Sequence, residues 1–281
     1  MKVKIIHFLT EDQYLLSGRI FEPEISNGKL LLINSATGVK QHIYFTFAGY
    51  MAENGFTVIT YDYRGIGESK PVKMRGFKSS MRIWGMTDYK AVTQYIKANY
   101  SGLKKYAHGH SVGALILGMN EDSKMFDEFI FTATQKAYFG NLGTKTKIEA
   151  CLGFGIVQPV STKLFGYFPA HYFGLGESLP SGSAFDWRTL IMNKKSTNKL
   201  LESTPDFSKE LKQKVFVLRF EDDAWVTEKG VNSLLQETYP NLKPEHRLVK
   251  VSESESGKIG HINFFRSYNK KLWQIILNKI S

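Results

Sequence analysis

Residues 105–119 read KYAHGHSVGALILGM, and this stretch decides the fold expected for the chain. Its centre, GHSVG at 109–113, is the one G-x-S-x-G match in the sequence. A strand-like segment precedes it and an apolar, helix-like segment follows. A serine at such a turn is lifted above the edge of a sheet, and its flanking glycines avoid collisions with neighbouring elements. The pattern therefore predicts that Ser111 is a nucleophile.

Working outward from this motif, apolar strands alternate with helical segments along most of the chain. Continuous apolar runs such as LLLINS at 30–35 and FTVITYDY at 56–63 are typical of strands buried on both faces. Alternating strands and helices predict an α/β protein with a mostly parallel central sheet of about eight strands flanked by helices. The expected strands are 3–9, 14–22, 30–35, 56–63, 105–110, 129–134, 214–220 and 246–252. The expected helices are 44–54, 82–100, 112–119, 228–238 and 263–279.

One long segment interrupts this alternation. Residues 136–212 are rich in glycine, aromatic residues and Ser/Thr, and contain no run typical of a buried strand. We interpret 136–212 as a cap inserted into an α/β core made of residues 1–135 and 213–281. The cap would lie over the carboxyl ends of the strands, above Ser111, and set the size of the substrate.

Several segments resemble a known superfamily. The GHSVG turn and AGYMAENGFTVITYDYRGIGES at 48–69 resemble the α/β-hydrolases, in particular the serine-aminopeptidase and monoglyceride-lipase branch. A narrower likeness, to the bacterial "predicted α/β hydrolases", rests on NSATG at 34–38 followed by Tyr44, GYFP at 166–169, and GH at 260–261 followed by FFR at 264–266. The likeness spans about 28–268 and implies the α/β-hydrolase fold. We interpret YDYRGIGES as structural, with charged groups that pair among themselves.

The superfamily orders its catalytic residues as serine, acid and histidine. His261 follows the last expected strand, and Gly260 before it permits a sharp loop, so His261 is the expected general base. The acid should follow strand 214–220, where Asp222 and Asp223 both lie. Asp223, two residues before the apolar pair Trp225-Val226, fits the usual spacing best, and Asp222 is the alternative. The other aspartate is free to cap a turn or the next helix.

The resemblance also implies an oxyanion hole made of backbone N–H groups. One donor would be Val112, which follows the nucleophile, and the other would be Ala36, in the loop after strand 30–35. The chain has Asn34-Ser35 where many hydrolases have His-Gly, which leaves the second donor open.

The expected reaction is hydrolysis of a carboxylic ester with a small or medium acyl group, through an acyl-enzyme and without metal or organic cofactor. Two alternatives stay open: an acyltransferase using the same residues, and a hydrolase-fold binding protein without activity. We expect Tyr167, Phe168 and Trp225 to contact substrate. Other aromatic residues of the cap could line a pocket or pack within the cap: Tyr138, Phe139, Phe154, Phe165, Tyr172, Phe173 and Trp187.

Composition narrows the remaining possibilities. The chain has 281 residues, 42% of them hydrophobic, and a formal net charge of +11. Its basic residues are scattered and carry no RNA-binding signature, so we expect no nucleic-acid partner and a small-molecule ester as substrate. The sequence has a single cysteine, no apolar run long enough for a membrane span and no signal-like segment, so a cytoplasmic protein is expected. The oligomeric state is left undetermined.

Overall fold

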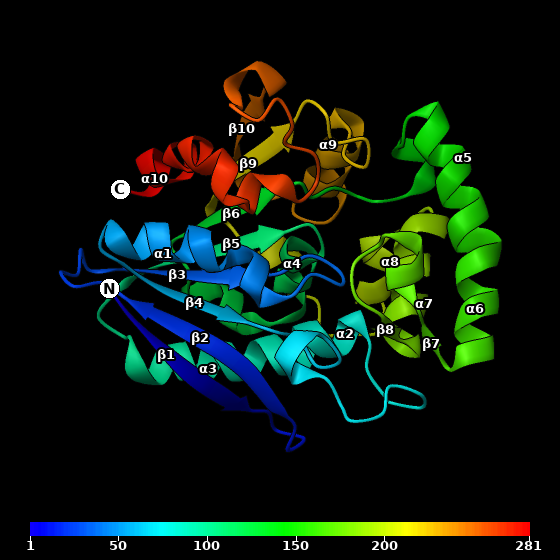
Figure 1. The fold of residues 1–281 in the computed structure, drawn as a ribbon, viewed down its shortest axis with the longest axis horizontal. Coiled ribbons are helices and arrows are strands. Elements are labelled where there is room, and N and C mark those ends of the chain that lie inside the picture. Colours follow the sequence, from blue (N-terminus) through cyan, green and yellow to red (C-terminus); the bar gives the residue numbers. More distant parts are fainter.

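The computed structural model describes residues 1–281 and is organised around an eight-stranded sheet (Figure 1). The strand order is β1-β2-β4-β3-β5-β6-β9-β10. β1 and β2 form an antiparallel hairpin, β2 pairs antiparallel with β4, and all other neighbours are parallel. The mostly parallel α/β-hydrolase sheet predicted from the sequence is confirmed. The strands are β1 (Lys2–Leu9), β2 (Leu15–Glu22), β3 (Lys29–Asn34), β4 (Phe56–Tyr61), β5 (Lys104–His110), β6 (Glu128–Thr132), β9 (Lys214–Phe220) and β10 (Lys243–Val249).

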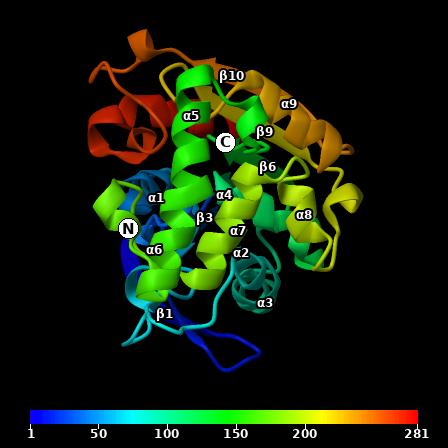
Figure 2. The same ribbon diagram turned by 90° about the vertical axis from the view of Figure 1, so that its right-hand side faces the viewer.

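Helices cover both faces of the sheet, and this is why its central strands are apolar along their whole length. All six residues of β4 are buried, as are five of the six in β3. α1 lies beside the C-terminal segment on one face, and α3 lies on the other (Figures 1 and 2). None of the helices is long and apolar enough to cross a lipid bilayer. The helices around the sheet are α1 (Phe45–Glu53), α2 (Met81–Ile83), α3 (Tyr89–Asn99), α4 (Val112–Leu115), α9 (Glu228–Glu237) and α10 (Gln274–Ile280).

The C-terminal part departs from the expected pattern in two places. β10 starts at Lys243, three residues before the expected strand, because it pairs in register with β9 from Lys214 onward as an exposed edge strand. The expected helix over 263–279 is a series of 3₁₀ turns, and only its last part, α10, is α-helical. The buried amide of Asn269 explains this, since it donates to the carbonyls of Lys258 and Asn263 from a non-helical backbone conformation.

Residues 136–212 lie outside the sheet, beyond the carboxyl ends of the parallel strands (Figure 1). The segment forms four helices and a two-stranded hairpin of its own. A second, smaller core holds it together around Leu142, Ala150, Phe154 and Ile191. Its elements are α5 (Thr144–Leu152), a π-helical turn (Gly153–Val157), α6 (Gln158–Phe165), β7 (Tyr167–Phe168), β8 (Leu179–Pro180), α7 (Ser181–Met192) and α8 (Thr197–Leu201).

A histidine is enclosed in the middle of the sheet. His108 on β5 is fully buried, its Nε2 lies 2.8 Å from Thr132 Oγ1, and its Nδ1 has no hydrogen-bond partner. Burial lowers the pKa of His108 from 6.5 to about 3. The imidazole is therefore neutral in the folded protein, whereas it gains a proton below about pH 6.5 in the unfolded chain.

This difference predicts an acid sensitivity that can be measured. Because the folded-state pKa is depressed, the stability linked to His108 is complete above pH 6.5 and is lost as pH falls toward 3, by up to about 1.4 kcal/mol per pH unit. Urea unfolding of the wild type and His108→Gln between pH 7 and pH 4 should show the wild type losing free energy of unfolding more steeply. The exposed His246→Gln variant is the control, and parallel wild-type and His108→Gln profiles would contradict the prediction.

Candidate active site

The turn at Ser111 is held by close backbone packing. Ser111 has φ 53° and ψ −117°, a conformation that L-residues rarely adopt. A Cβ on Gly113 would lie 2.2 Å from the carbonyl oxygen of Asn34, and one on Gly109 would lie 2.5 Å from the backbone of Ala114. Glycine is therefore required at both positions because α4 crosses the end of β3 and folds back on β5 at contact distance.

The histidine and the two aspartates occupy distinct positions. His261 Nδ1 lies 2.7 Å from Asp223 Oδ2, so the contact expected between these residues is present. The other oxygen of Asp223 accepts a hydrogen bond from the Trp225 N–H at 2.9 Å. Asp222 faces away from the ring and accepts hydrogen bonds from the N–H groups of Ile259 and Gly260, at 2.9 and 2.8 Å. Asp223 thus contacts the imidazole, while Asp222 holds the loop that carries it.

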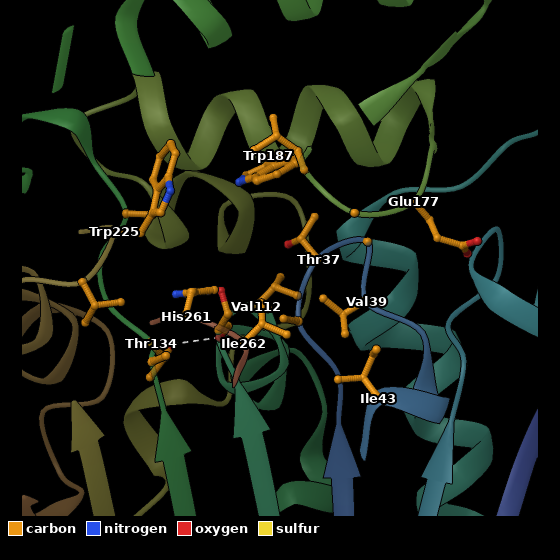
Figure 3. A pocket seen from close by; sticks show the side chains of 18 of the residues that line it. Thr37, Val39, Ile43, Val112, Thr134, Glu177, Trp187, Trp225, His261 and Ile262 are labelled. Atoms are coloured by element: carbon orange, nitrogen blue, oxygen red, sulfur yellow. Dashed lines mark hydrogen bonds between the residues drawn. The ribbon is translucent and has the colours of Figure 1, made fainter. Parts of the chain in front are cut away.

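Ser111 and His261 open into the same cavity, which has a volume of about 560 Å³ (Figure 3). The cavity lies between the ends of the strands and helix α7 of the outer segment. Asp223 fixes the protonated nitrogen of His261 as Nδ1, which leaves Nε2 as the proton acceptor. No hydrogen bond joins His261, the expected general base, to Ser111 in this structure. Such contacts are often long without ligand and shorten when substrate binds.

The residues that line the cavity differ in part from those expected. Trp225, a predicted substrate contact, lines it, and so does Trp187 of α7; both rings lie in the upper part of the view in Figure 3 and pack on Phe154. Tyr167 and Phe168 do not line it, so their prediction as substrate contacts is wrong. They form β7, which pairs with β8, and the Phe168 ring stacks on Phe173 at 5.6 Å. Fourteen hydrophobic residues line the cavity, among them Leu115, Ala137, Trp187, Leu190, Ile191, Trp225 and Val226.

One of the two predicted oxyanion donors is already engaged. Val112 begins α4, so its N–H has no acceptor within the helix and borders the cavity. The N–H of Ala36, by contrast, donates to the Tyr44 hydroxyl at 3.0 Å, and the prediction of Ala36 as the second donor is therefore wrong for this structure. The next residue, Thr37, lines the cavity, and its N–H makes no hydrogen bond within the protein.

The Tyr44 hydroxyl begins a buried chain of hydrogen bonds. It lies 2.7 Å from His110 Nδ1, and His110 Nε2 lies 2.8 Å from the carbonyl oxygen of His261. Burial, reinforced by nearby His261, holds the pKa of His110 well below its usual value, and burial raises the pKa of Tyr44. Both groups are therefore neutral. His110 donates through Nε2 to His261 and accepts through Nδ1 from Tyr44, which in turn accepts from Ala36.

We call this chain of Ala36, Tyr44, His110 and the His261 carbonyl the backbone relay. It ties the loop after β3, the start of α1 and the Ser111 turn to the loop that carries His261. The sequence contains both side chains, in NSATG followed by Tyr44 and in GHSVG, but no spacing rule pairs them. The relay was therefore missed by the sequence analysis, because its members are 66 and 151 residues apart.

The charged segment after β4 is structural, but its partners lie elsewhere in the chain. Arg64 forms ion pairs with Asp88 at 2.6 Å and with Asp12 at 2.5 Å, and Glu68 pairs with Arg19. The expectation that these groups pair among themselves is thus wrong. They anchor the segment to the first hairpin and to the π-helical turn (Trp84–Asp88) that leads into α3. No group of three or more His, Cys, Asp or Glu side chains is placed to bind a metal ion.

Comparisons with known proteins agree with this architecture. Residues 29–138, which include β3 and the Ser111 turn, match the family model described as serine aminopeptidase, S33. A search of curated proteins gives no significant match.

Solved structures share the fold at low sequence identity. An esterase of Pyrococcus furiosus is 15% identical, with a TM-score of 0.62 over 99% of this chain and 88% of its own. An alpha-beta serine hydrolase homologue from Coxiella burnetii is 14% identical, with a TM-score of 0.59 over 100% and 99%. A bromoperoxidase from Bacillus anthracis is 15% identical, with a TM-score of 0.60 over 98% and 99%. Proteins with these different names share one fold, so the fold alone does not identify the reaction, whereas the geometry of the site bears on it directly.

From the backbone relay we predict that Tyr44→Phe lowers both stability and kcat. Removing the hydroxyl leaves two buried polar groups, the Ala36 N–H and His110 Nδ1, without partners, at a cost of about 1–3 kcal/mol in stability. The His261 loop also loses part of its anchor, so kcat toward a short ester should fall about tenfold. Tyr89→Phe removes a buried hydroxyl that contacts Ser123 away from the site, and should lower stability while leaving kcat unchanged. An increase in kcat for Tyr44→Phe would show instead that Ala36 becomes a useful donor when released.

Proposed function

We propose that this chain, a member of the α/β-hydrolase superfamily, is a serine esterase that hydrolyses carboxylic esters with small or medium acyl groups. The observation that carries the proposal is the 2.7 Å contact between His261 Nδ1 and Asp223, at a cavity that Ser111 also lines. A strained serine, an oriented imidazole and a buried carboxylate are the three parts of a Ser-His-Asp triad.

In the first half of the proposed reaction, Ser111 Oγ attacks the ester carbonyl while His261 Nε2 accepts its proton. Asp223 stabilises the imidazolium that forms. The N–H groups of Val112 and Thr37 donate to the tetrahedral oxyanion, with Thr37 in the place first assigned to Ala36. Collapse of this intermediate breaks the ester C–O bond, and His261 returns the proton to the departing alcohol. The product of this half is an acyl-enzyme.

In the second half, water attacks the acyl-enzyme and gives its proton to His261. The carboxylic acid leaves, and the proton returns to Ser111. Each step needs only the residues already at the cavity and a water molecule. The Asp223 side chain is 1% exposed, so water does not compete with the carboxylate for the hydrogen bond from the imidazole N–H.

We further propose that residues 136–212 act as a cap that limits the substrate. Support comes from α7, which contributes Trp187, Leu190 and Ile191 to the cavity wall. The cap also contacts the loop after β3. A Cβ placed on Gly176 would lie only 2.6 Å from the Gly38 carbonyl oxygen, and the Glu177 N–H donates to that oxygen at 2.8 Å. The cap therefore closes on the same loop that supplies Thr37.

The triad assignment is tested by labelling with a fluorophosphonate probe and by ester kinetics. Wild-type protein should be labelled and Ser111→Ala should not. Asp223→Asn should lower kcat by about 10³–10⁴-fold, since it disturbs the imidazole tautomer. Asp222→Asn keeps one acceptor oxygen for the loop and should cost less than tenfold. A larger loss for Asp222→Asn, or no labelling of wild type, would reject the assignment. Transfer of the acyl group to an added alcohol in preference to water would identify an acyltransferase.

The cap proposal is tested by the chain-length preference for p-nitrophenyl esters. Trp187→Ala removes a large side chain from the cavity wall, so kcat/KM for long acyl chains should rise relative to the acetate by about tenfold. Tyr167→Ala changes an aromatic residue of the same cap that does not line the cavity, and its preference should match the wild type. Equal changes for all esters in Trp187→Ala would contradict the proposal.

A further inference from the structure

The longest helical stretch of the cap has no protein packed on its outer side. α5, the π-helical turn and α6 run without interruption from residue 144 to residue 165. This stretch lies at the edge of the molecule farthest from the sheet in Figure 1 and runs across the face that Figure 2 presents to the viewer.

The distribution of side chains around this helix is the reverse of what a surface helix normally shows. Three of the five residues on the buried side are polar, and the Gln158 side-chain amide donates to the Thr162 hydroxyl at 3.1 Å. The five residues on the opposite side are all aliphatic and are 57–68% exposed. The buried side is formed by Thr146, Ala150, Phe154, Gln158 and Thr162. The exposed side, here called the outer stripe, is formed by Ile148, Leu152, Ile156, Val160 and Leu164.

The outer stripe is continuous because of the π-helical turn. Residues four apart drift around a regular α-helix by about 40° at each step, so five of them would wind away from a single face. The π-helical turn at Gly153–Val157 has more residues per turn than an α-helix. Residues four apart therefore drift the other way around the axis there, which offsets part of the α-helical drift. The seventeen residues from Ile148 to Leu164, which are sixteen helical steps apart, then form an apolar ridge about 24 Å long. Single exposed aliphatic residues are common, but a continuous ridge indicates an interaction surface.

The charges beside the outer stripe indicate what it contacts. Lys145, Lys147 and Lys163 are exposed and form no ion pair, and Glu149 is the one acidic residue between 144 and 165, which leaves a local charge of three minus one, or +2. Exposed aromatic rings of Phe165, Tyr172 and Phe173 follow at the end of the helix. Aliphatic residues flanked by lysines and aromatic rings are the composition of helices that lie in the interface of an anionic bilayer.

A second copy of the chain fits this surface less well. Two-fold packing of two outer stripes would bring the lysines of both copies together, with one glutamate from each copy to offset three lysines. The net charge of +11 would add to the repulsion, whereas it favours an anionic membrane surface. We propose that the outer stripe docks the protein onto lipid bilayers that contain anionic lipids, with the helix lying parallel to the membrane plane.

The experiment is co-sedimentation with phosphatidylcholine vesicles that contain or lack about one quarter phosphatidylglycerol. Wild-type protein should bind the anionic vesicles, and binding should weaken as salt is raised. The double variant Leu152→Ser/Ile156→Ser should bind on the order of tenfold more weakly. The double variant Ile25→Ser/Val72→Ser, at exposed apolar positions outside the cap, is the matched control and should bind as the wild type does.

Further variants separate lipid binding from folding and from catalysis. Replacing Lys145, Lys147 and Lys163 by glutamine should remove most of the preference for anionic vesicles. Ser111→Ala should bind as the wild type does, so the result does not depend on the proposed esterase activity. Both serine double variants should unfold cooperatively at the temperature of the wild type, which shows that they fold. Absence of binding, binding unaffected by Leu152→Ser/Ile156→Ser, or a concentration-dependent dimer abolished by that variant would overturn the proposal.

Discussion

The packing of α4 against the end of β3 is the contact on which the rest of the site depends. Gly113 lies against the Asn34 carbonyl so closely that no Cβ fits between them. The side chain of Asn34 reinforces the junction, since it donates to the His108 carbonyl on β5 and accepts from the Tyr61 hydroxyl on β4. This junction holds Ser111 in its strained conformation and places the first N–H groups of α4 at the cavity.

The second requirement is that the His261 loop is held where its imidazole faces the cavity beside Ser111. Three anchors hold it: Asp222 through two backbone N–H groups, Asp223 through the imidazole, and His110 through the His261 carbonyl. Because His110 directly precedes Ser111 in the chain, its hydrogen bond to the His261 carbonyl fixes the position of the loop relative to Ser111. Burial keeps this relay neutral, so its hydrogen-bond directions are defined.

The cap has two faces with different physical demands. Its inner face supplies Trp187 and its neighbours to the cavity, where the proposed function requires them to shield the reacting ester from water. Its outer face carries the outer stripe, whose exposure to water is unfavourable for a protein without a partner surface. An enzyme whose cap rests on a bilayer would have its apolar cavity wall and its lipid contact on the two sides of one helical layer. This arrangement brings apolar esters and the site into the same region.

The sequence by itself determined the elements whose signals are local. Apolar runs located β3, β4 and β5, and the GHSVG turn located Ser111, because both patterns reflect constraints on neighbouring residues. The order of residues along the chain also selected His261 and Asp223. Contacts between distant segments were decided by the tertiary structure. The Tyr44 hydroxyl occupies the Ala36 N–H, α7 replaces β7 at the cavity, and Asn269 breaks the last helix, because each outcome depends on which surfaces pack together and no spacing in the sequence records that.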